Sequence, residues 1–392
     1  MAKLGEVCDI LNGYAFKSNQ YTTSGVRIIR ISNVQKGYIE DKSPVYYPCD
    51  DENVKKYELK QNDLLISLTG NVGRTALLEE KFLPAALNQR VSCVRLKEPD
   101  KVLKTYLFHL LNSDYFEQQC MKAAEGVAQK NLSPKWLFEY KIPIYSIERQ
   151  KEISNTLDKI DLLIILRKQQ LAKLDELVKA RFVEMFGDSV ANTKNFPSTT
   201  LETVMTVFPQ NGLYKPQTDY VQDDTGIPIL RIDAFYNGKV TNWNTLKRLI
   251  CSETEIDRYL LRENDIVINR VNSIEYLGKC AHIVGLKEKT VFESNMMRFH
   301  MDEKKVNAVY VTEVLCTEDI YRQILRRAKK SVNQASINQE DVKSLEILVP
   351  PLSLQNQFAA FVERVDQQKQ TVQQSLEKLE LMKKALMQEY FG

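Results

Sequence analysis

The chain has 392 residues, of which 43% are hydrophobic, and its formal net charge is +3 at pH 7. This length and apolar content suffice for two or three globular domains with cores of their own, which excludes a disordered chain. No apolar run approaches the roughly 18 to 20 residues that cross a bilayer, and the N-terminus lacks the apolar core of a signal peptide, so we expect a cytoplasmic protein.

The first part of the chain, residues 1–145, is predicted to form a mixed α/β domain. β-rich runs such as Ile28–Ile31 and Leu64–Leu68 alternate with turn signals, and a helical stretch follows from about Val102 to Ala123. The Asn62-Asp63 pair stands just before a strand, where Asn tolerates a left-handed turn better than most residues do.

Residues 146–187 are predicted to form one long helix. The segment Ile147–Phe186 contains no Gly or Pro, and Ser146 precedes it as a candidate N-cap. The run Leu162–Leu166 is apolar on all faces, so a two-stranded pairing would leave part of it exposed, which indicates further partner helices. A heptad stripe runs through Leu157, Ile160, Ile164, Arg167, Leu171, Leu174, Val178, Arg181 and Met185.

The second half of the chain repeats the first at an offset that drifts from about 201 to 205 residues. GIPILRI at Gly226–Ile232 matches GVRIIRI at Gly25–Ile31, and the C-terminal EYFG matches EMFG at Glu184–Gly187. After a polar linker at 188–198, residues 199–351 therefore predict a second α/β domain with a late helix at about Val309–Lys329. Residues 352–392 predict a second long helix, with Ser353 as its N-cap.

The two heptad stripes are complementary in their charged positions. The second stripe runs through Val362, Val365, Lys369, Val372, Leu376, Leu379, Lys383, Leu386 and Tyr390. Where one stripe carries a cation, the equivalent position of the other is apolar, so each helix would pair poorly with its own copy. We therefore predict an α+β fold with two α/β domains, two long helices that form an antiparallel coiled coil, and a pseudo-twofold internal repeat. An ordinary amphipathic helix whose Arg and Lys stems lie along a seam is the alternative.

No catalytic constellation is evident in the sequence. The segment Gly70–Thr75 has the wrong spacing for a phosphate-binding loop and carries Arg for Lys, so it is interpreted as a tight turn. The nearest match to a methyltransferase base-holding motif, Val349–Leu352, lacks the polar and aromatic ends. Seven cysteines without a CxxC pair predict reduced thiols and no zinc site. No nucleophile or metal partner is evident for His109, His282 or His300.

The doubled order of these blocks resembles the specificity subunit of Type I restriction-modification systems. Each half carries a GxxIxRI strand, an Asn-Asp turn where the family usually has Gly-Asp, a Gly-Arg or Gly-Lys turn, a late helix and a long helix. The junction Val349–Leu352 followed by Gln355 fits the family pattern of Pro-Pro-Leu, two residues and Gln. The first junction, Ile142–Ile144 followed by Glu148–Ile153, lacks the paired prolines.

The resemblance implies a sequence-specific DNA-binding subunit without catalytic activity. Residues 1–145 and 199–351 would be target recognition domains, each reading one half of a bipartite, asymmetric site in double-stranded DNA. The helices at 146–187 and 352–392 would be spacers that set the distance between the domains and dock two methyltransferase subunits, which restriction subunits could join. The family's S-adenosylmethionine, ATP and magnesium are bound by those partners, so no cofactor or metal is expected here.

Candidate DNA contacts are polar and cationic side chains beside strand ends and turns, where they can contact phosphates and base edges. In the first domain these are Arg30, Asn33, Thr69, Asn71, Arg74, Asn88, Gln89, Arg90, Lys130 and Asn131. In the second they are Arg231, Tyr236, Asn269, Arg270, Asn272, Lys279, Arg298, Lys329, Lys330 and Gln334. Arg30 and Arg231 could equally pair within a sheet, and the cluster from Arg326 to Lys330 could be a solvated helix end. Trp136 and Trp243 are interpreted as packing residues.

Helix pairing and partner binding are assigned to apolar residues of the two long helices. The residues are Leu157, Ile160, Leu162, Ile164, Ile165, Leu171, Leu174, Val178, Val362, Val365, Val372, Leu376, Leu379 and Leu386.

Two other functions stay open beside the one that the resemblance implies. The alternatives are the specificity subunit of a methyltransferase-only or Type IIB-like system, and a coiled-coil adaptor that does not bind DNA. The missing motifs disfavour a stand-alone DNA-modifying enzyme, and an adaptor would leave the α/β domains without a role.

Overall fold

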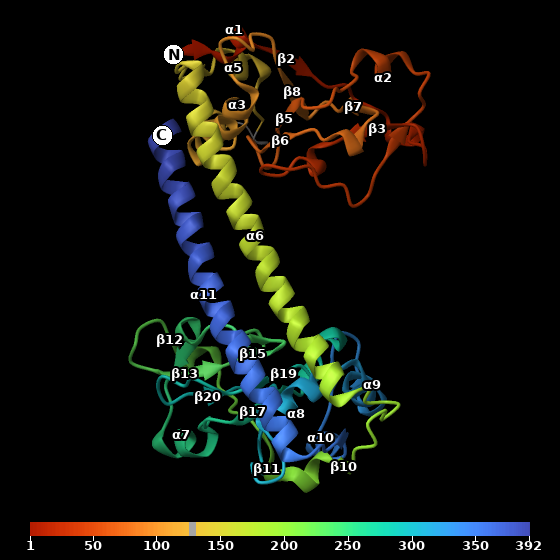
Figure 1. Cartoon of the computed structure of the whole chain (residues 1–392), viewed down its shortest axis with the longest axis vertical. Coiled ribbons are helices and arrows are strands. Elements are labelled where there is room, and N and C mark those ends of the chain that lie inside the picture. The colour runs from red at the N-terminus through yellow and green to blue at the C-terminus, as the bar shows by residue number, and fades with distance from the viewer. Residues whose placement is uncertain (125–130) are drawn as a thin grey trace. The chain divides into compact units, whose positions relative to one another are not determined.

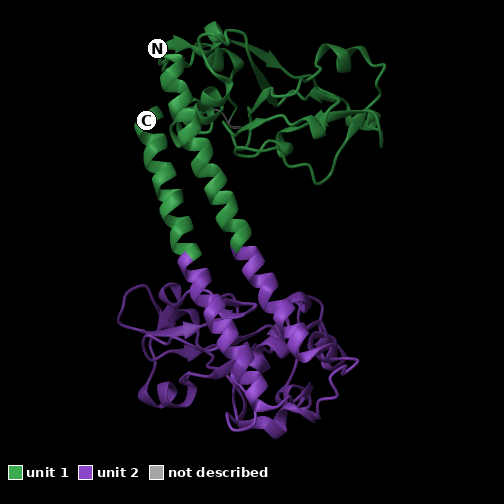
Figure 2. Ribbon diagram, in the orientation of Figure 1, with its two compact units in different colours: residues 1–170, 372–392 green, residues 171–371 purple. Residues whose placement is uncertain are grey.

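The computed structural model describes residues 1–124 and 131–392, and these fall into two compact units. Unit 1 comprises residues 1–170 and 372–392, and unit 2 comprises residues 171–371 (Figure 1, Figure 2). Each unit contains one α/β part and a stretch of each of two long helices, α6 (Ile147–Phe186) and α11 (Leu352–Phe391). No helix within the described ranges has the length and apolarity needed to span a membrane.

The α/β part of unit 1 is built on two main sheets. Its strands are β1 (Ala2–Lys3), β2 (Cys8–Asn12), β3 (Val26–Ile29), β4 (Tyr46–Tyr47), β5 (Leu64–Ser67), β6 (Thr75–Leu77), β7 (Ala85–Leu87), β8 (Val91–Leu96) and β9 (Lys141–Ile142). The larger sheet is antiparallel in the order β2-β8-β5-β6; the smaller, β4-β3-β7, has a parallel pair between β3 and β7, and β1 pairs with β9. In β5, Leu64 and Ile66 pack into one core and Leu65 into another, because alternate side chains point to opposite faces. This explains the uninterrupted apolar run.

The helices of unit 1 correct one expectation. They are α1 (Leu4–Val7), α2 (Glu52–Lys56), α3 (Lys104–Leu111), α4 (Asp114–Ala123) and α5 (Pro134–Glu139), besides the long ones. The helical stretch predicted at Val102–Ala123 is thus two helices. The Ser113 hydroxyl accepts a hydrogen bond from the Phe116 amide at 3.1 Å, which caps α4 and ends the continuous helix.

The α/β part of unit 2 contains a six-stranded sheet and three smaller ones. Its strands are β10 (Ser198–Thr200), β11 (Met205–Asn211), β12 (Tyr220–Val221), β13 (Ile227–Leu230), β14 (Phe235–Tyr236), β15 (Gly238–Val240), β16 (Lys247–Leu249), β17 (Asp265–Asn269), β18 (Val271–Asn272), β19 (Cys280–His282), β20 (Val291–Phe292), β21 (Met296–Met301), β22 (Lys329–Lys330), β23 (Ala335–Ser336) and β24 (Glu346–Leu348). The large sheet has the order β11-β21-β17-β19-β15-β14. The others are β12-β16-β13-β20, β18-β23-β22 and β10-β24.

The helices of unit 2 show the same correction as those of unit 1. They are α7 (Glu253–Tyr259), α8 (Ala308–Leu315), α9 (Glu318–Arg327) and α10 (Gln339–Lys343). The helix predicted at Val309–Lys329 is divided after Leu315, because Thr317 caps α9 by accepting from the amide of Ile320. The chain then turns into the strand β22.

The same buried contacts recur in both units at equivalent positions. The Asn turns are left-handed as predicted, with φ of 69° at Asn62 and 66° at Asn264. In unit 1 the buried Gln150 of α6 accepts from the Leu103 amide at 2.8 Å, and in unit 2 the buried Gln355 of α11 accepts from the Asn307 amide at 2.8 Å. Each glutamine therefore fixes the start of a long helix to the α/β part beside it, which gives the junction motif a structural role.

The two long helices begin in different ways. Ser146 caps α6 as predicted, with its hydroxyl accepting from the Arg149 amide at 3.3 Å. The prediction of Ser353 as the cap of α11 is wrong, since the helix already begins at Leu352 and the Pro351 carbonyl accepts from the Leu354 amide at 2.9 Å. The second junction therefore enters its helix directly after the prolines.

Within each unit, α6 and α11 pair antiparallel. In unit 1, Lys168 of α6 forms an ion pair with Glu380 at 3.1 Å, and Lys383 pairs with the earlier α6 residue Asp161. In unit 2, Lys369 pairs with Asp175, again on the opposite helix. The predicted coiled coil is confirmed, and the seam lysines are accommodated by carboxylates of the partner helix as well as by apolar positions.

Candidate nucleic-acid interface and helix surface

In unit 1, three segments that carry candidate DNA contacts meet at Leu68, just after β5. The Leu68 amide donates to the Arg90 carbonyl at 3.0 Å, and the Leu68 carbonyl accepts from the Leu132 amide at 2.8 Å. This junction brings together the turns that hold Thr69, Asn71, Arg74, Asn88, Gln89, Arg90 and Asn131, all of which are exposed or half-buried. Polar side chains from three distant parts of the sequence therefore share one surface.

Not every predicted residue of unit 1 lies on that surface. Asn33 is buried; its amide donates to the Glu40 carbonyl and the Asp41 carboxylate, both at 3.0 Å, and its oxygen accepts from the Arg30 amide at 2.8 Å, so the side chain is committed to the domain. Arg30 donates to the Ser43 carbonyl at 2.8 Å, which is a contact within the domain. Lys130 lies outside the described residues.

Unit 2 has an equivalent junction at Arg270. The Arg270 amide donates to the Asn295 carbonyl at 2.9 Å, and its carbonyl accepts from the Ile337 amide at 2.9 Å. Around it lie Asn272, Lys279 and the β22–β23 hairpin with Lys329, Lys330 and Gln334. The hairpin residues are exposed, so their charge and amide groups are available to a ligand. Tyr236 is 41% exposed.

Three predicted residues of unit 2 are committed to the protein itself. Arg298 is buried and donates to Gln210 at 2.9 Å, beside the carboxylate of Asp265. Asn269 is also buried, and its amide donates to the Tyr276 carbonyl at 3.3 Å. Arg231 lies near Glu293 and Asp233, which is the pairing within the domain left open as an alternative. Asn269 and Arg298 therefore support the surface from inside, and Arg231 is paired at its edge.

The basic cluster after α9 is divided between two roles. Arg327 donates to the Ser344 carbonyl and to the Gln323 carbonyl, both at 2.9 Å, which ties α9 to α10. Lys329 and Lys330 are exposed on β22. Arg326, also exposed, and the hairpin lysines, rather than Arg327, are therefore the members of this cluster available for phosphate contacts.

No arrangement that indicates catalysis or metal binding occurs in residues 1–124 and 131–392. No group of three or more His, Cys, Asp or Glu side chains there could hold a metal ion. The histidines contact polar side chains instead: His109 contacts Asp158 at 2.8 Å, His282 contacts the Asn264 oxygen at 3.1 Å, and His300 contacts Asp265 at 2.9 Å and lies 3.9 Å from Glu303. Burial lowers the pKa of His282 to about 4, so this imidazole is neutral near pH 7.

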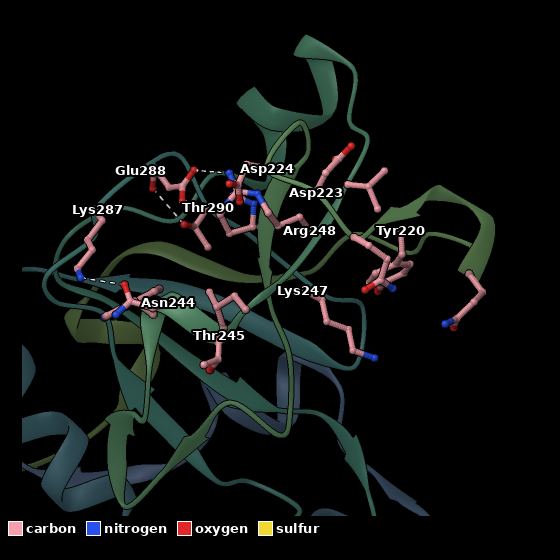
Figure 3. Close-up of a pocket in the computed structure, with 16 residues that line it drawn as sticks. Tyr220, Asp223, Asp224, Asn244, Thr245, Lys247, Arg248, Lys287, Glu288 and Thr290 are labelled. Carbon is pink, nitrogen blue, oxygen red and sulfur yellow. Dashed lines mark hydrogen bonds and ion pairs between the residues drawn. The ribbon is translucent and has the colours of Figure 1, made fainter. Parts of the chain in front are cut away.

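A polar pocket of about 550 Å³ lies beside β13 and β16 in unit 2 (Figure 3). Arg248 forms a two-point ion pair with Glu288 at 2.9 and 2.7 Å, and Lys287 donates to Asn244 at 2.9 Å. The charged groups Arg248, Glu288 and Lys287 thus each have a partner among the lining residues. The pocket shows no nucleophile next to a base, and its chemistry does not identify a substrate.

The long helices of unit 1 carry an exposed apolar surface outside their seam. We call this the outer helix surface; it consists of Leu162, Leu163, Ile165, Leu166, Leu381 and Met382, which are 42% to 69% exposed. Ile164 in the same stretch is only 9% exposed, because it lies in the seam. Exposed apolar side chains that are close in sequence on paired helices are typical of a protein-binding surface.

The residues assigned to helix pairing lie mainly in the seams of the two units. The buried ones are Leu157, Ile160, Ile164, Leu174, Val178, Val362, Val365, Val372 and Leu376, while Leu171, Leu379 and Leu386 are half-buried. Sequence patterns missed the aromatic part of the unit 2 seam, where Phe186 lies 4.7 Å from Tyr310 and 5.4 Å from Phe358, ring centre to ring centre. Tyr310 belongs to α8, so a heptad count could not find it.

Comparison with known proteins agrees with this architecture. Residues 1–176 and 196–381 match the family model described as Type I restriction modification DNA specificity domain. The chain is 24% identical over 392 aligned residues to the Type I restriction enzyme EcoKI specificity subunit of Escherichia coli K12, with 94% of this chain and 81% of the relative covered.

Solved structures confirm the predicted fold class. The S subunit of a Type I restriction-modification system from M. genitalium has a TM-score of 0.59 at 14% identity, with 100% of this chain and 95% of that one covered. A chain from a structure of complex assembly and conformational transition of the type I R-M system has a TM-score of 0.55 at 17% identity, with 100% and 96% covered.

Proposed function

The chain belongs to the family of Type I restriction modification DNA specificity domains, and on this premise we propose that it binds double-stranded DNA as the specificity subunit of such a system. It has no catalytic role of its own. Its two α/β parts, residues 1–145 and 199–351, act as target recognition domains, and each reads one half of a bipartite, asymmetric sequence.

One observation carries the proposal: the same three-segment junction occurs twice, with different side chains on it. The hydrogen bonds at Leu68 in unit 1 recur at Arg270 in unit 2, so the backbone frame is common to both. The side chains at equivalent positions differ, with Gln89 and Arg90 in unit 1 and Ser294 and Asn295 in unit 2. A shared frame with divergent donors and acceptors is expected for two readers of unequal half-sites.

The long helices supply the second part of the proposal, the binding of partners. The outer helix surface, whose Leu162 and Ile165 were assigned to partner binding from sequence, is apolar and open in unit 1. Two methyltransferase subunits dock on the helices, and restriction subunits join that complex. The segments 146–187 and 352–392 act as spacers between the two readers, with 188–198 as the linker. The cofactors of the reaction belong to the partners.

The test is to express the full chain with its methyltransferase subunits and to map methylated bases genome-wide. We expect a bipartite, asymmetric sequence, and replacing residues 1–145 by the matching domain of a relative should change only one of its halves. Duplex binding should weaken steeply with salt, since phosphate contacts release counterions. The unaltered chain without partners serves as the control for intrinsic methyl transfer.

Three outcomes would contradict the proposal. Methyl transfer by the isolated chain would identify a stand-alone enzyme. Failure to bind duplex DNA at any salt concentration would indicate a coiled-coil adaptor. A change in both halves after the single domain exchange would show that the two domains do not read separately.

A further inference from the structure

A hairpin and a turn meet in the same way in both units. In unit 1 the bridge between Val34 and Ile39 forms the hairpin, and in unit 2 the equivalent pair is Phe235 and Val240. In the turn of unit 1 the Ser67 amide donates to the Arg74 carbonyl at 2.9 Å, and in unit 2 the Asn269 amide donates to the Lys279 carbonyl at 2.8 Å.

The second turn is three residues longer, but its end matches residue by residue. The amide of Gly73 donates to the Ser67 carbonyl at 2.9 Å, and that of Gly278 donates to the Asn269 carbonyl at 3.0 Å. Both glycines have positive φ, of 86° and 77°. The residue after the glycine is a cation in each unit, Arg74 or Lys279.

In unit 1 the cation is held by two amide oxygens. The guanidinium of Arg74 donates to the side-chain oxygen of Gln35, which is the hairpin residue after Val34. With the Asn71 amide turned so that its oxygen faces the guanidinium, that oxygen accepts from Nη2 at 3.1 Å and from Nη1 at 3.2 Å. The arginine is half-buried, and its fork is fixed in one orientation.

In unit 2 the cation is held by two aromatic rings. Lys279 Nζ lies 3.9 Å from the ring centre of Tyr276 and 5.2 Å from that of Tyr236. Tyr236 follows Phe235 on the hairpin as Gln35 follows Val34, and Tyr276 precedes the lysine by three residues as Asn71 precedes the arginine. Within the described residues no hydrogen bond or ion pair occupies the ammonium, so its donors stay available while the rings restrict its position.

We propose that these two sets, Gln35-Asn71-Arg74 and Tyr236-Tyr276-Lys279, are specificity-determining elements in which each cation reads a base edge of its own half-site. The proposal rests on the function proposed above and names one element within it. Guanine is the expected base, because its O6 and N7 acceptors are the common partners of Arg and Lys in the major groove.

The joint change of all three positions favours a base contact over a phosphate contact. Phosphates are the same in both half-sites, so a phosphate-binding cation would need no change of support between the copies. Here the backbone frame is kept, while amides and arginine are replaced together by tyrosines and lysine. The supporting residues are positioning residues, since they act through the cation.

The experiment selects DNA from libraries with one half-site randomised at a time, using the full chain with its methyltransferase subunits. Arg74→Ala should reduce discrimination at one base pair of the first half-site by roughly ten- to one-hundred-fold and leave the second unchanged. Lys279→Ala should do the converse. Tyr276→Phe keeps the ring and should keep discrimination, whereas Tyr276→Ala should lose it, at unchanged thermal midpoint.

Two outcomes would overturn the proposal. Uniformly weaker binding to all sequences, with a salt slope lower by about one, would make the cation a phosphate contact. If base discrimination persists in both Arg74→Ala and Lys279→Ala, the two sets only stabilise the fold of their domains. A failure of the proposed function itself looks different, because the unaltered complex would then select no bipartite sequence at all.

Discussion

A buried aspartate supports the central strands of each unit, but its partners differ. Asp63 receives a two-point contact from Arg95, with Nε at 2.8 Å and Nη2 at 2.6 Å. Asp265 contacts His300 at 2.9 Å and lies 3.6 Å from Arg298. Burial raises the pKa of Asp265, and these partners act in the opposite direction. The Asn-Asp turn is thus a folding element, and Arg298 belongs to it rather than to the DNA surface.

A second residue-level feature makes unit 2 sensitive to acid. His282 on β19 occupies the position of Leu77 on β6, as the strand registers Ile266–His282 and Leu64–Leu77 show. Burial lowers its folded-state pKa to about 4 from the ordinary histidine value of 6.5. Between these values the unfolded chain binds the proton and the folded one does not, so the stability of unit 2 falls as pH drops below 6.5.

The first prediction is that His282→Gln removes this loss. Through this group, the free energy of unfolding of the unaltered protein should fall by about 2 kcal/mol between pH 7 and pH 5. The variant should not show this fall, since the glutamine amide does not titrate in this range and can still donate to Asn264. Urea unfolding followed by Trp243 in a Trp136→Phe background reports on unit 2 alone. Comparing the two proteins cancels the other titrating groups, and matching pH profiles would refute the assignment.

At the scale of elements, the long helices separate two surfaces along one sequence. Ile164 lies in the seam at 9% exposure, whereas its neighbour Ile165 is 52% exposed on the outer helix surface. Successive residues on a helix point about 100° apart, so an all-apolar run serves both a seam and an outer partner. The run Leu162–Leu166 is therefore explained by two surfaces rather than by an excess of core residues.

The second prediction uses these neighbours as a matched pair. Ile164→Glu should cost about 3 kcal/mol or more, because it buries an unpaired charge, and should lower the thermal midpoint. Ile165→Glu should leave the midpoint within a few degrees and should weaken capture of the methyltransferase subunits, measured by co-purification. If Ile165→Glu assembles normally, the outer helix surface is not the docking site; if Ile164→Glu is harmless, the seam assignment fails.

At the scale of the whole molecule, the proposed spacing of the two readers depends on both helices. Ion pairs fix the helix register separately in each unit, Lys383 with Asp161 in one and Lys369 with Asp175 in the other. Both α6 and α11 pass from one unit into the other between residues 170 and 171 and between 371 and 372. An insertion in one helix alone would therefore disturb at least one of these registers.

The third prediction inserts one heptad into each helix, after Gln170 and after Thr371. Both registers are then kept, and the spacers lengthen by about 10 Å. At about 3.4 Å per base pair, the preferred gap between the half-sites should grow by about three base pairs, while both half-sequences stay the same. Selection from a library of variable gaps measures this. The single insertion into α6 is the control for misfolding, and an unchanged gap in the folded double insertion would show that the helices do not set the distance.

Local patterns in the sequence determined the duplication, the order of the elements and the two long helices. Repeated motifs such as GVRIIRI and GIPILRI, left-handed turns at Asn62 and Asn264, and heptad periodicity are properties of neighbouring residues. Such features can be predicted without knowing which distant residues are in contact. The missed helix breaks at Ser113 and Thr317 were also local, because both are N-caps inside an otherwise helical pattern.

Only the tertiary structure decided which polar residues are supports and which are available to a ligand. Asn33 and Arg298 are of residue types that often contact DNA, but burial and partners distant in sequence commit them to the fold. Gln35 and Tyr276 were missed, because Gln35 contacts a cation 39 residues away and Tyr276 shares Lys279 with Tyr236 from a distant segment. Burial and hydrogen bonding arise from contacts between segments that sequence periodicity does not bring together.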